Sequence, residues 1–408
     1  MSAPDAGNPG RDYTSAFRRY QFLAFMMMGV VNPLLTPYMQ SRGMTKAEIG
    51  GIQAFTWLAA AMAPFLWGMA SDSARDRRTP ILVAILGATI SFGAFWFCNT
   101  FVAFAATMLL FAAFFRGIVP MSTALTFAWA EPRRVDYSRI RLFGAAGYVV
   151  ALLLLYVPLR GRTDLSPIFI CFAAFGLAAV VGLGSLPKLG STGRRRFDPG
   201  ALTLFARRDF LICLICTFFA QAAFASHYAF FSPYLTGMLG VRPQYITLFW
   251  AFGSVFEVLM YLATGPLLRR FGTKWLLVLG MFGIAIRLGV YAAFPNIPAV
   301  FLVQGLHALT FAAVHASTVT FVNYAAPEKW RSSAQTLWEG ITIGLGSAAG
   351  SLAGGYLAQV WDYRVLFAVM AAVAAASGVV FLIFGRAALQ TRVPEPAPEA
   401  LPPDPSEE

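Results

Sequence analysis

The feature that most constrains this chain is a series of long apolar blocks separated by short polar or basic segments. Blocks such as Ile168–Leu186, Leu276–Ala293 and Val365–Phe384 are mostly or wholly uncharged. About 20 apolar residues in a helix cross the ~30 Å hydrocarbon core of a bilayer. Repeated blocks of this length predict membrane-spanning helices rather than the buried helices of a water-soluble domain.

The charge content agrees with this interpretation. Only 12% of the 408 residues are charged and 58% are hydrophobic, whereas a soluble domain carries about 25% charged residues. The net charge of +12 raises the question of nucleic-acid binding. The basic residues, however, form short clusters between apolar blocks, which is typical of the cytoplasmic loops of membrane proteins. We therefore expect a lipid bilayer as partner and no nucleic acid.

Apolar blocks and the breakers between them predict an all-α membrane protein with twelve transmembrane helices. The expected spans are about 17–40, 46–70, 79–98, 101–130, 140–158, 166–186, 209–237, 244–268, 274–294, 297–325, 332–360 and 363–386. They give five regions: a cytoplasmic N-terminal segment 1–16, a six-helix bundle 17–186, a basic cytoplasmic loop 187–208, a second six-helix bundle 209–388, and a Pro/Glu-rich tail 389–408. The composition of the tail predicts disorder.

The distribution of Lys and Arg predicts the orientation. With the N-terminus inside, 23 of the 31 basic residues fall in cytoplasmic segments, six in external loops and two within spans. This asymmetry predicts that both termini are cytoplasmic. We expect a multi-pass protein of a bacterial-type cytoplasmic (inner) membrane.

The two halves resemble each other in sequence. Pro37-Tyr38 recurs as Pro233-Tyr234 after 196 positions, and Gly68 of the first basic turn recurs as Gly265 after 197. This nearly constant offset predicts a six-plus-six duplication, and parallel repeats of this kind place a solute site between the halves at mid-depth.

Ionisable residues inside the spans are the strongest functional signal, because a charge at mid-bilayer costs about 2.5–3.5 kcal/mol on insertion scales. With a rise of 1.5 Å per residue, Glu257, Arg287 and His315 fall at one depth on three successive helices. Arg116 is also near mid-span, whereas His307 is expected further out and Glu339 nearer the cytoplasm. The six such residues are Arg116, Glu257, Arg287, His307, His315 and Glu339.

Polar and aromatic residues at helical spacing accompany these charges and predict a solute-binding surface. They are Asn32 and Thr36, Gln221 and Tyr228, and Trp250 and Tyr261 on either side of Glu257. His307 and His315 are eight residues apart, too far to share a metal ion, and Cys213 and Cys216 lie in an apolar run without a second pair. We therefore expect no metal and no cofactor.

Several segments resemble a known family. GMASDSARDRR (68–78) resembles the loop 2–3 signature of the major facilitator superfamily. Four other stretches, NPLLTPYMQSRGMTKAEIG (32–50), DYSRIRLFGAAGYV (136–149), LHALTFAAVHAS (306–317) and GLGSAAGSLAGGYL (344–357), resemble its phenylpropionate-permease-like branch, related to oligosaccharide–proton symporters such as lactose permease. The resemblance implies Glu, Arg and His on helices eight to ten and an aromatic acid as solute. Arg269 departs from the signature, which has an Asp there.

The signature also predicts a cytoplasmic gate. Asp72 ends a helix, and carboxylates there pair with arginines or with the positive end of another helix. Arg77, Arg78 and Arg141 are its candidate partners. Enforcement of topology alone is the simpler interpretation of these arginines.

These features together predict a monomeric secondary active transporter, not an enzyme, that couples proton movement to uptake of a small organic solute by alternating access. Glu257 would hold the proton, with His315 as relay and His307 and Glu339 nearby. Arg287 or Arg116 would bind a carboxylate solute, because a guanidinium binds a carboxylate through two parallel hydrogen bonds. The alternatives are a sugar or nucleoside symporter, an exporter by proton antiport, and a non-transporting sensor.

Overall fold

The computed structural model describes residues 12–190 and 198–385, without the side chains of residues 261 and 262. Every regular element in these residues is helical. The first half contains six long helices: α1 (Thr14–Ser41), α2 (Lys46–Ser73), α3 (Arg78–Ala94, extended by η1, Phe95–Phe97), α4 (Phe101–Ala130, extended by η2, Glu131–Arg133), α5 (Tyr137–Leu159) and α6 (Pro167–Gly184). The predicted tail 389–408 and most of the segment 1–16 lie outside the described residues.

The second half begins with a short 3-10 segment, η3 (Pro199–Ala206), and α7 (Arg208–Gly237). The tenth predicted span is built from α9 (Ile297–Leu302), η4 (Val303–Leu306), the π-helix η5 (Ala308–Ala313) and α10 (Val314–Ala325). The eleventh comprises η6 (Glu328–Trp330), α11 (Arg331–Glu339), the π-helix η7 (Gly340–Gly346) and α12 (Ser347–Val360), and the last is α13 (Tyr363–Phe384).

The remaining element, α8 (Pro243–Ala293), consists of two helices. Its 51 residues would extend about 76 Å at 1.5 Å per residue, far more than a bilayer requires. Gly272 interrupts it with φ 76° and ψ 166°, a conformation that favours glycine. The two arms match the predicted spans 244–268 and 274–294. Eleven described helical stretches are long and apolar enough to cross a membrane, and the one within α8 is Ala263–Ala293. The arm of α8 that precedes Gly272 is a further long helix beside it. The prediction of an all-α protein with twelve transmembrane helices is confirmed.

Several helix starts are capped by side chains of the chain itself. Thr45 and Glu48 form a reciprocal capping box at the start of α2, and Asn296 and Asp362 accept backbone N–H groups at the starts of α9 and α13. Hydrocarbon offers no hydrogen-bond partner, so each uncapped backbone group near the membrane would be costly. These caps help to fix the first residues of α2, α9 and α13.

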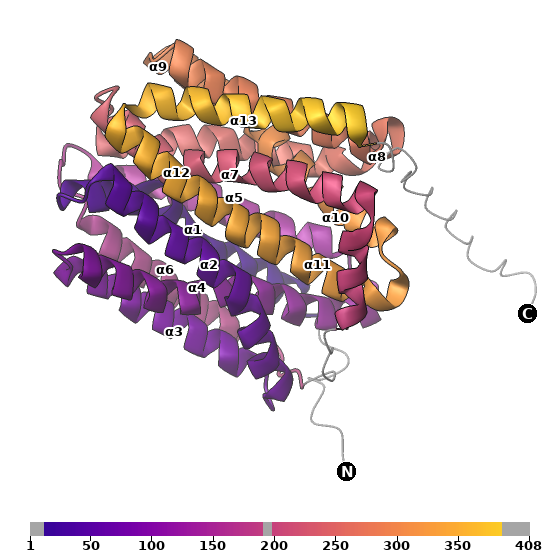
Figure 1. The fold of residues 1–408 in the computed structure, drawn as a ribbon. Helices are drawn as coiled ribbons and strands as arrows, with labels where there is room; N and C mark the ends of the chain where they lie inside the picture. Colours follow the sequence, from indigo (N-terminus) through magenta and orange to yellow (C-terminus); the bar gives the residue numbers. More distant parts are fainter. Residues whose placement is uncertain (1–11, 191–197, 386–408) are drawn as a thin grey trace, which may run out of the picture.

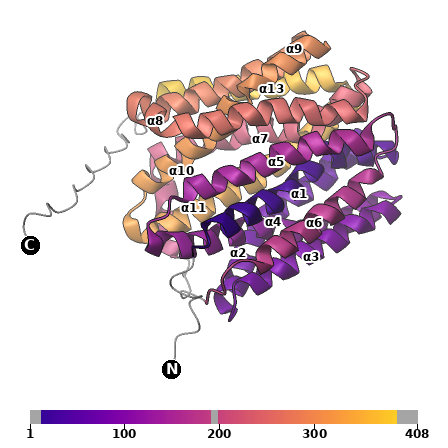
Figure 2. The same cartoon turned by 180° about the vertical axis from the view of Figure 1, so that it is seen from behind.

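The long helices lie side by side along one direction, with the first-half helices below and the second-half helices above in Figure 1. Within the first half α1 packs against α5 and α6, and α2 against α4; within the second half α13 packs against α7 and α8. The halves meet mainly where α2 packs against α12 and α5 against α8, and α1 also packs against α7. Figure 2 shows α5 running directly beneath α7 and α8 from the other side.

At one end of the bundle the two halves are in close contact. A Cβ atom on Gly50 would lie 2.5 Å from the Ser351 carbonyl oxygen and 2.9 Å from the Gly355 Cα, so α2 and α12 can approach this closely only because side chains are absent. Lys46 adds hydrogen bonds across the same contact, from its Nζ to the Ala358 carbonyl (3.0 Å) and from its backbone N–H to Gln359 (3.0 Å). On the α5–α8 side of this end, the Gly161 N–H donates to Gln244 at 2.9 Å.

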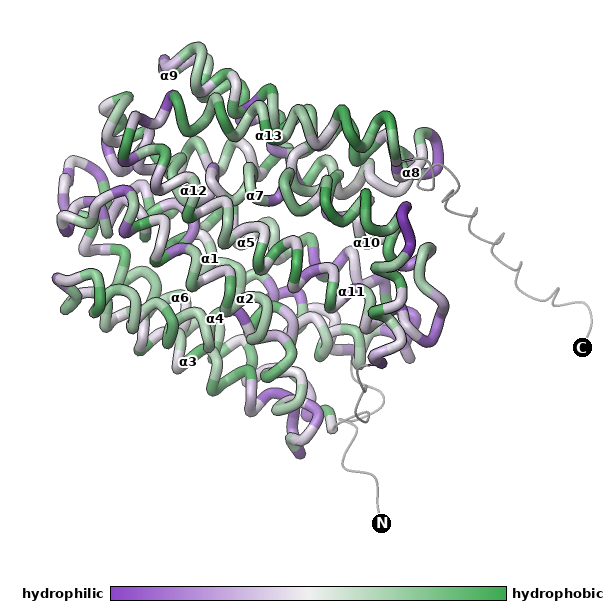
Figure 3. Tube along the Cα trace, in the orientation of Figure 1, coloured by the Kyte–Doolittle hydropathy of each residue, from purple (hydrophilic) through white to green (hydrophobic). Residues whose placement is uncertain are grey.

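The outer surface along the helices is hydrophobic, and polar residues gather mainly at the two ends (Figure 3). Ile90, Val157 and Ile170 are 75%, 70% and 74% exposed. Water would make such exposure unfavourable over so many helices, whereas lipid tails match it. The fold is therefore that of a multi-pass integral membrane protein.

Candidate functional site

The side chain of Arg287, on the second arm of α8, is buried in the second half and surrounded by neutral acceptors. Its Nε donates to the Tyr291 hydroxyl at 2.8 Å, one terminal nitrogen donates to Gln304, and the other lies 2.9 Å from Nδ1 of His307 and 3.3 Å from the Thr310 hydroxyl. Gln304 in turn donates to the Tyr291 hydroxyl at 2.8 Å. Each of the three guanidinium nitrogens therefore has a protein partner.

His307 connects this arginine to a carboxylate. Its Nε2 lies 3.2 Å from an Oε of Glu257, on the first arm of α8, and its side chain is only 4% exposed whereas that of Glu257 is 21% exposed. Arginine has donors only, so the Nδ1 atom that faces Arg287 must accept. The Nε2 atom of a neutral imidazole then carries the hydrogen and donates it to Glu257. The geometry thus assigns His307 a single tautomer between a fixed cation and a partly exposed carboxylate.

The structure places His307, rather than His315, between Arg287 and Glu257. His315 instead stacks on Phe311, with ring centroids 5.9 Å apart and planes 3° apart, and Phe311 stacks on His307 at 6.3 Å. The three rings therefore form one continuous stack. His315 lies within electrostatic range of Glu339, Glu257 and Arg141.

The helix that carries His307 is irregular on both sides of this residue. The expectation that His307 lies further out assumed one uniform α-helix from residue 297 to residue 325. The structure has a 3-10 segment at Val303–Leu306 and a π-helix at Ala308–Ala313 on either side of His307. Each departs from the rise and turn of an α-helix, and π-segments of this kind are frequent at functional sites. Arg287 and Glu257 are connected indirectly, through the imidazole of His307.

Arg116, on α4 in the first half, has a different environment. Its guanidinium lies over the Trp57 ring, 4.5 Å from the centroid, and Tyr228 of the second half is within electrostatic range. Its buried Nε has no hydrogen-bond partner, and in the described part of the chain Arg116 forms no ion pair. A cation placed on an aromatic face with an unused donor is suited to bind an anion.

Polar residues of the first half also face Glu257. Tyr148 of α5 forms a hydrogen bond with Asn32 of α1 and lies within electrostatic range of Glu257. Thr36, one turn further along α1, is buried and its hydroxyl has no partner. Asn32 is thus linked to Tyr148, a residue within electrostatic range of Glu257 that the sequence pattern did not single out.

The other predicted binding residues make local contacts. Gln221 donates to Ser347 at 3.1 Å, and the Trp250 indole donates to Ser232 at 3.0 Å. Tyr228 packs between Phe224 and Trp250 and reaches His307, at centroid distances of 4.9, 5.0 and 6.3 Å. The side chain of Tyr261 lies outside the described part. Glu339 accepts a hydrogen bond from Gln335 at 2.9 Å.

The predicted gate residues divide into separate contacts. Asp72 pairs with Arg77 at 3.4 Å. Arg78 pairs instead with Asp76 at 2.8 Å and donates to the Leu186 carbonyl, and Arg141 lies over the Phe25 ring, 4.0 Å from the centroid. All of these contacts lie within the first half or its continuation into the central segment.

Sequence reasoning missed several residues of the site: Trp57, Tyr148, Tyr291, Gln304 and Thr310. Tyr291 and Gln304 carried a usable signal, since Tyr291 is four residues after Arg287 and Gln304 is three before His307, both on one helical face. Trp57 and Tyr148 had none, because nothing local distinguishes them from other aromatic residues of the spans. Among the described residues, no cluster of His, Cys, Asp or Glu could hold a metal ion.

Comparisons with known proteins place this chain in a family. The chain is 27% identical to the maltose permease of Geobacillus stearothermophilus over 86% of this chain and 90% of that protein. It is 26% identical to a putative nucleoside transporter, YegT, of Escherichia coli K12 (83% of each chain) and 24% identical to a probable 3-phenylpropionic acid transporter of the same organism (86% and 93%).

A solved structure shares the fold. The nucleoside transporter NupG superposes with a TM-score of 0.81 at 17% identity, over 92% of this chain and 99% of that one. The model of the MFS_1-like family matches residues 17–369. A match of this extent shows that the chain belongs to the MFS_1-like family, within the major facilitator superfamily of membrane transporters.

Proposed function

We propose that this protein is a proton-coupled secondary transporter that takes up a small organic solute by alternating access. Its similarity to sugar, nucleoside and phenylpropionate transporters supports a transporter rather than an enzyme. The observation that carries the proton coupling is the connected set of Arg287, His307 and Glu257.

In this mechanism Glu257 carries the proton. His307 cannot take a second proton on Nδ1 without directing an N–H at the guanidinium of Arg287, so protonation falls on the partly exposed carboxylate. Ionised Glu257 accepts a charge-assisted hydrogen bond from His307. Protonation removes the negative charge and weakens this bond, which frees Glu257 to turn toward Tyr148 and Asn32 of the other half. Proton binding thereby changes a contact between the halves, which is the requirement for coupling.

The solute in this proposal is a carboxylate, and Arg116 binds it. Arg287 is the weaker candidate because all three of its nitrogens already have protein partners. Arg116 has an unused buried donor, and Trp57, Tyr228 and Phe224 supply flat apolar surface near it. An aromatic or other hydrophobic acid suits both features.

The orientation in the proposal follows the basic residues, with both termini in the cytoplasm of a bacterial-type inner membrane. The glycine contact between α2 and α12 then closes the external end. The partial exposure of Glu257, together with closure at that end, fits a state that faces the cytoplasm. We propose that the protein acts as a monomer.

A sugar or nucleoside symporter is the second candidate, favoured by the maltose permease and nucleoside transporter relatives. Uptake by purified protein in liposomes, with an imposed inward pH gradient, separates the two. The assay compares phenylpropionate, maltose and a nucleoside, each with and without the gradient. Gradient-driven accumulation of the acid supports the proposal. Accumulation of a neutral solute alone supports the alternative, and accumulation that ignores the gradient contradicts both.

A further inference from the structure

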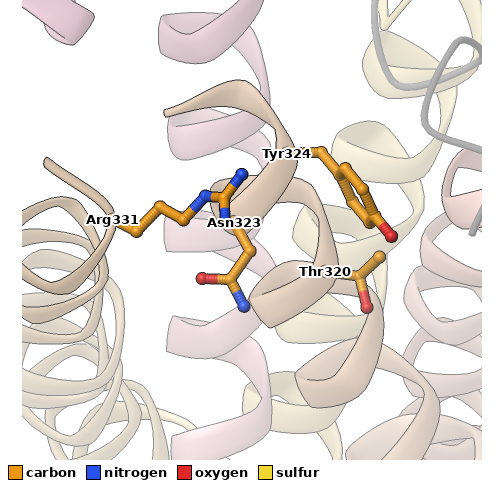
Figure 4. Close-up of a pocket in the computed structure, with 4 residues that line it drawn as sticks. All are labelled: Thr320, Asn323, Tyr324 and Arg331. Atoms are coloured by element: carbon orange, nitrogen blue, oxygen red, sulfur yellow. The ribbon is translucent and has the colours of Figure 1, made fainter. Parts of the chain in front are cut away.

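A cavity of about 410 Å³ lies where α10 ends and α11 begins, lined by Thr320, Asn323, Tyr324 and Arg331 (Figure 4). None of these residues belongs to the Arg287–His307–Glu257 set. Its volume is in the range of about 300–1,000 Å³ that small-molecule sites occupy. It lies beside the polar connection between two membrane-spanning helices, at the end of the bundle that the basic residues place in the cytoplasm.

The lining offers hydrogen-bond donors and a positive charge but no carboxylate. Figure 4 shows the Arg331 guanidinium reaching toward Asn323, and within the residues that the structure describes Arg331 forms no ion pair. The Asn323 amide and the Tyr324 hydroxyl are further donors. Thr320 does not offer a donor to the cavity, because its hydroxyl already donates to the Ala316 carbonyl at 2.8 Å. A guanidinium with an amide and a phenol matches the oxygens of a phosphate.

Nearby charges leave this region positive. Lys329 lies over the Trp330 ring, 4.8 Å from the centroid, and adds a second cation close to Arg331. Arg207 donates to the Ala325 carbonyl at 3.0 Å but is paired with Asp209 at 2.8 Å. Glu328, which is exposed, is the one acidic residue of the α10–α11 connection. An anion is therefore favoured here by the local charge balance.

The position of the cavity favours a phosphate that belongs to a lipid headgroup over a soluble phosphate. Tyr324 is 45% exposed, and amphipathic aromatic residues gather at the level of lipid headgroups. Basic pockets between transmembrane helices on the cytoplasmic side bind anionic lipid headgroups. We propose that the cavity binds the headgroup phosphate of an anionic phospholipid, held by Arg331, Asn323 and Tyr324. A bound lipid bridges the end of α10 and the start of α11.

Native mass spectrometry of the purified protein, titrated with phosphatidylglycerol or phosphatidylcholine, tests this without any transport assay. The Arg331→Gln variant removes the guanidinium. Arg134→Gln, in the exposed α4–α5 connection, makes the same change of net charge away from the cavity and serves as the matched control. We expect Arg331→Gln to bind phosphatidylglycerol about tenfold more weakly, the loss of one charge-assisted contact, and Arg134→Gln to bind it as the wild type does.

Asn323→Ala provides a second variant that keeps all charges, and we expect it to weaken phosphatidylglycerol binding several-fold. Equal binding by wild type, Arg331→Gln and Asn323→Ala would overturn the proposal, as would an equal loss in Arg134→Gln. A further arm adds inorganic phosphate at millimolar concentration. If free phosphate displaces the lipid completely at that concentration, the cavity is a site for soluble anions and the lipid assignment is wrong.

Discussion

The Nε2 atom of His307 lies 3.2 Å from a carboxylate oxygen of Glu257. Because Arg287 occupies the other ring nitrogen, this contact works in one direction, with the histidine as donor and the glutamate as acceptor. Protonating the glutamate removes the negative charge that strengthens this hydrogen bond, so the contact weakens when the proton binds. The consequences can be tested residue by residue.

The two histidines of the tenth span should differ sharply in effect. His307→Asn removes the link between Arg287 and Glu257, and the loss of a hydrogen bond to a charged group predicts about a tenfold to hundredfold fall in gradient-driven uptake. His315→Asn is the matched control, since His315 lies on the same helix and stacks only on Phe311. We expect it to change uptake by less than about threefold, because this substitution removes no hydrogen bond to a charged group. Initial rates in liposomes measure both, and equal effects would contradict the assignment.

Arg287 should contribute strongly to stability. Arg287→Met leaves Gln304, Tyr291 and His307 without their shared donor, and buried groups left unsatisfied cost about 1–3 kcal/mol each. We expect a clear fall in the temperature of thermal unfolding in detergent, with Arg287→Lys in between. Arg139→Met is the control, because that arginine is 80% exposed and pairs only with Asp136. If Arg287→Met unfolds at the same temperature as Arg139→Met, the hydrogen bonds of Arg287 do not stabilise the fold as proposed.

Arg116 should affect solute affinity rather than stability. Arg116→Gln keeps polarity and removes the charge, so the KM for a transported carboxylate should rise about tenfold to hundredfold, the value of a charge-assisted pair. Its unfolding temperature should stay close to that of wild type, because the guanidinium has no ion pair to lose among the described residues. Uptake rates against solute concentration give the KM. An unchanged KM with reduced maximal rate would assign Arg116 a different role.

The α2–α12 contact should hold the external end closed. A larger side chain at Gly50 has no room, since even a Cβ would lie 2.5 Å from the Ser351 carbonyl. Gly50→Leu should therefore increase the separation of the halves at this end. Double electron–electron resonance between spin labels attached at positions Ser41 and Trp361, in a cysteine-free background, measures the distance between the two halves at this end. The same substitution at Gly93, which has open space around it and lies within the helix α3, is the control. Identical distance distributions in both variants would contradict the proposed role of the α2–α12 contact.

The fold was predictable because one physical requirement dominates it. Each span must be long and apolar, and hydropathy alone reports this, even for the two arms of α8. Basic turns and the repeated Pro-Tyr pairs then supplied the division into halves. The break at Gly272 was implied only as a gap between spans, since a positive φ leaves no mark in composition.

The site was predictable in its members but not in its connections. Glu257, Arg287 and His307 were all identified because charged and titratable residues are rare in spans. Depth estimated from a uniform rise then selected His315 as the partner, whereas the contacts to Arg287 and Glu257 are made by His307. Trp57 and Tyr148 reach the site from the first half, and contacts between halves depend on packing that no local pattern encodes.

The most direct test of the central claim is solute accumulation by Glu257→Gln in liposomes with an inward pH gradient. Glutamine keeps the size of the side chain and can accept from His307, but it cannot release a proton. The account predicts that the variant loses accumulation against a concentration gradient while solute exchange at equal concentrations on both sides continues at a rate close to wild type. Full gradient-driven accumulation by Glu257→Gln would contradict the account.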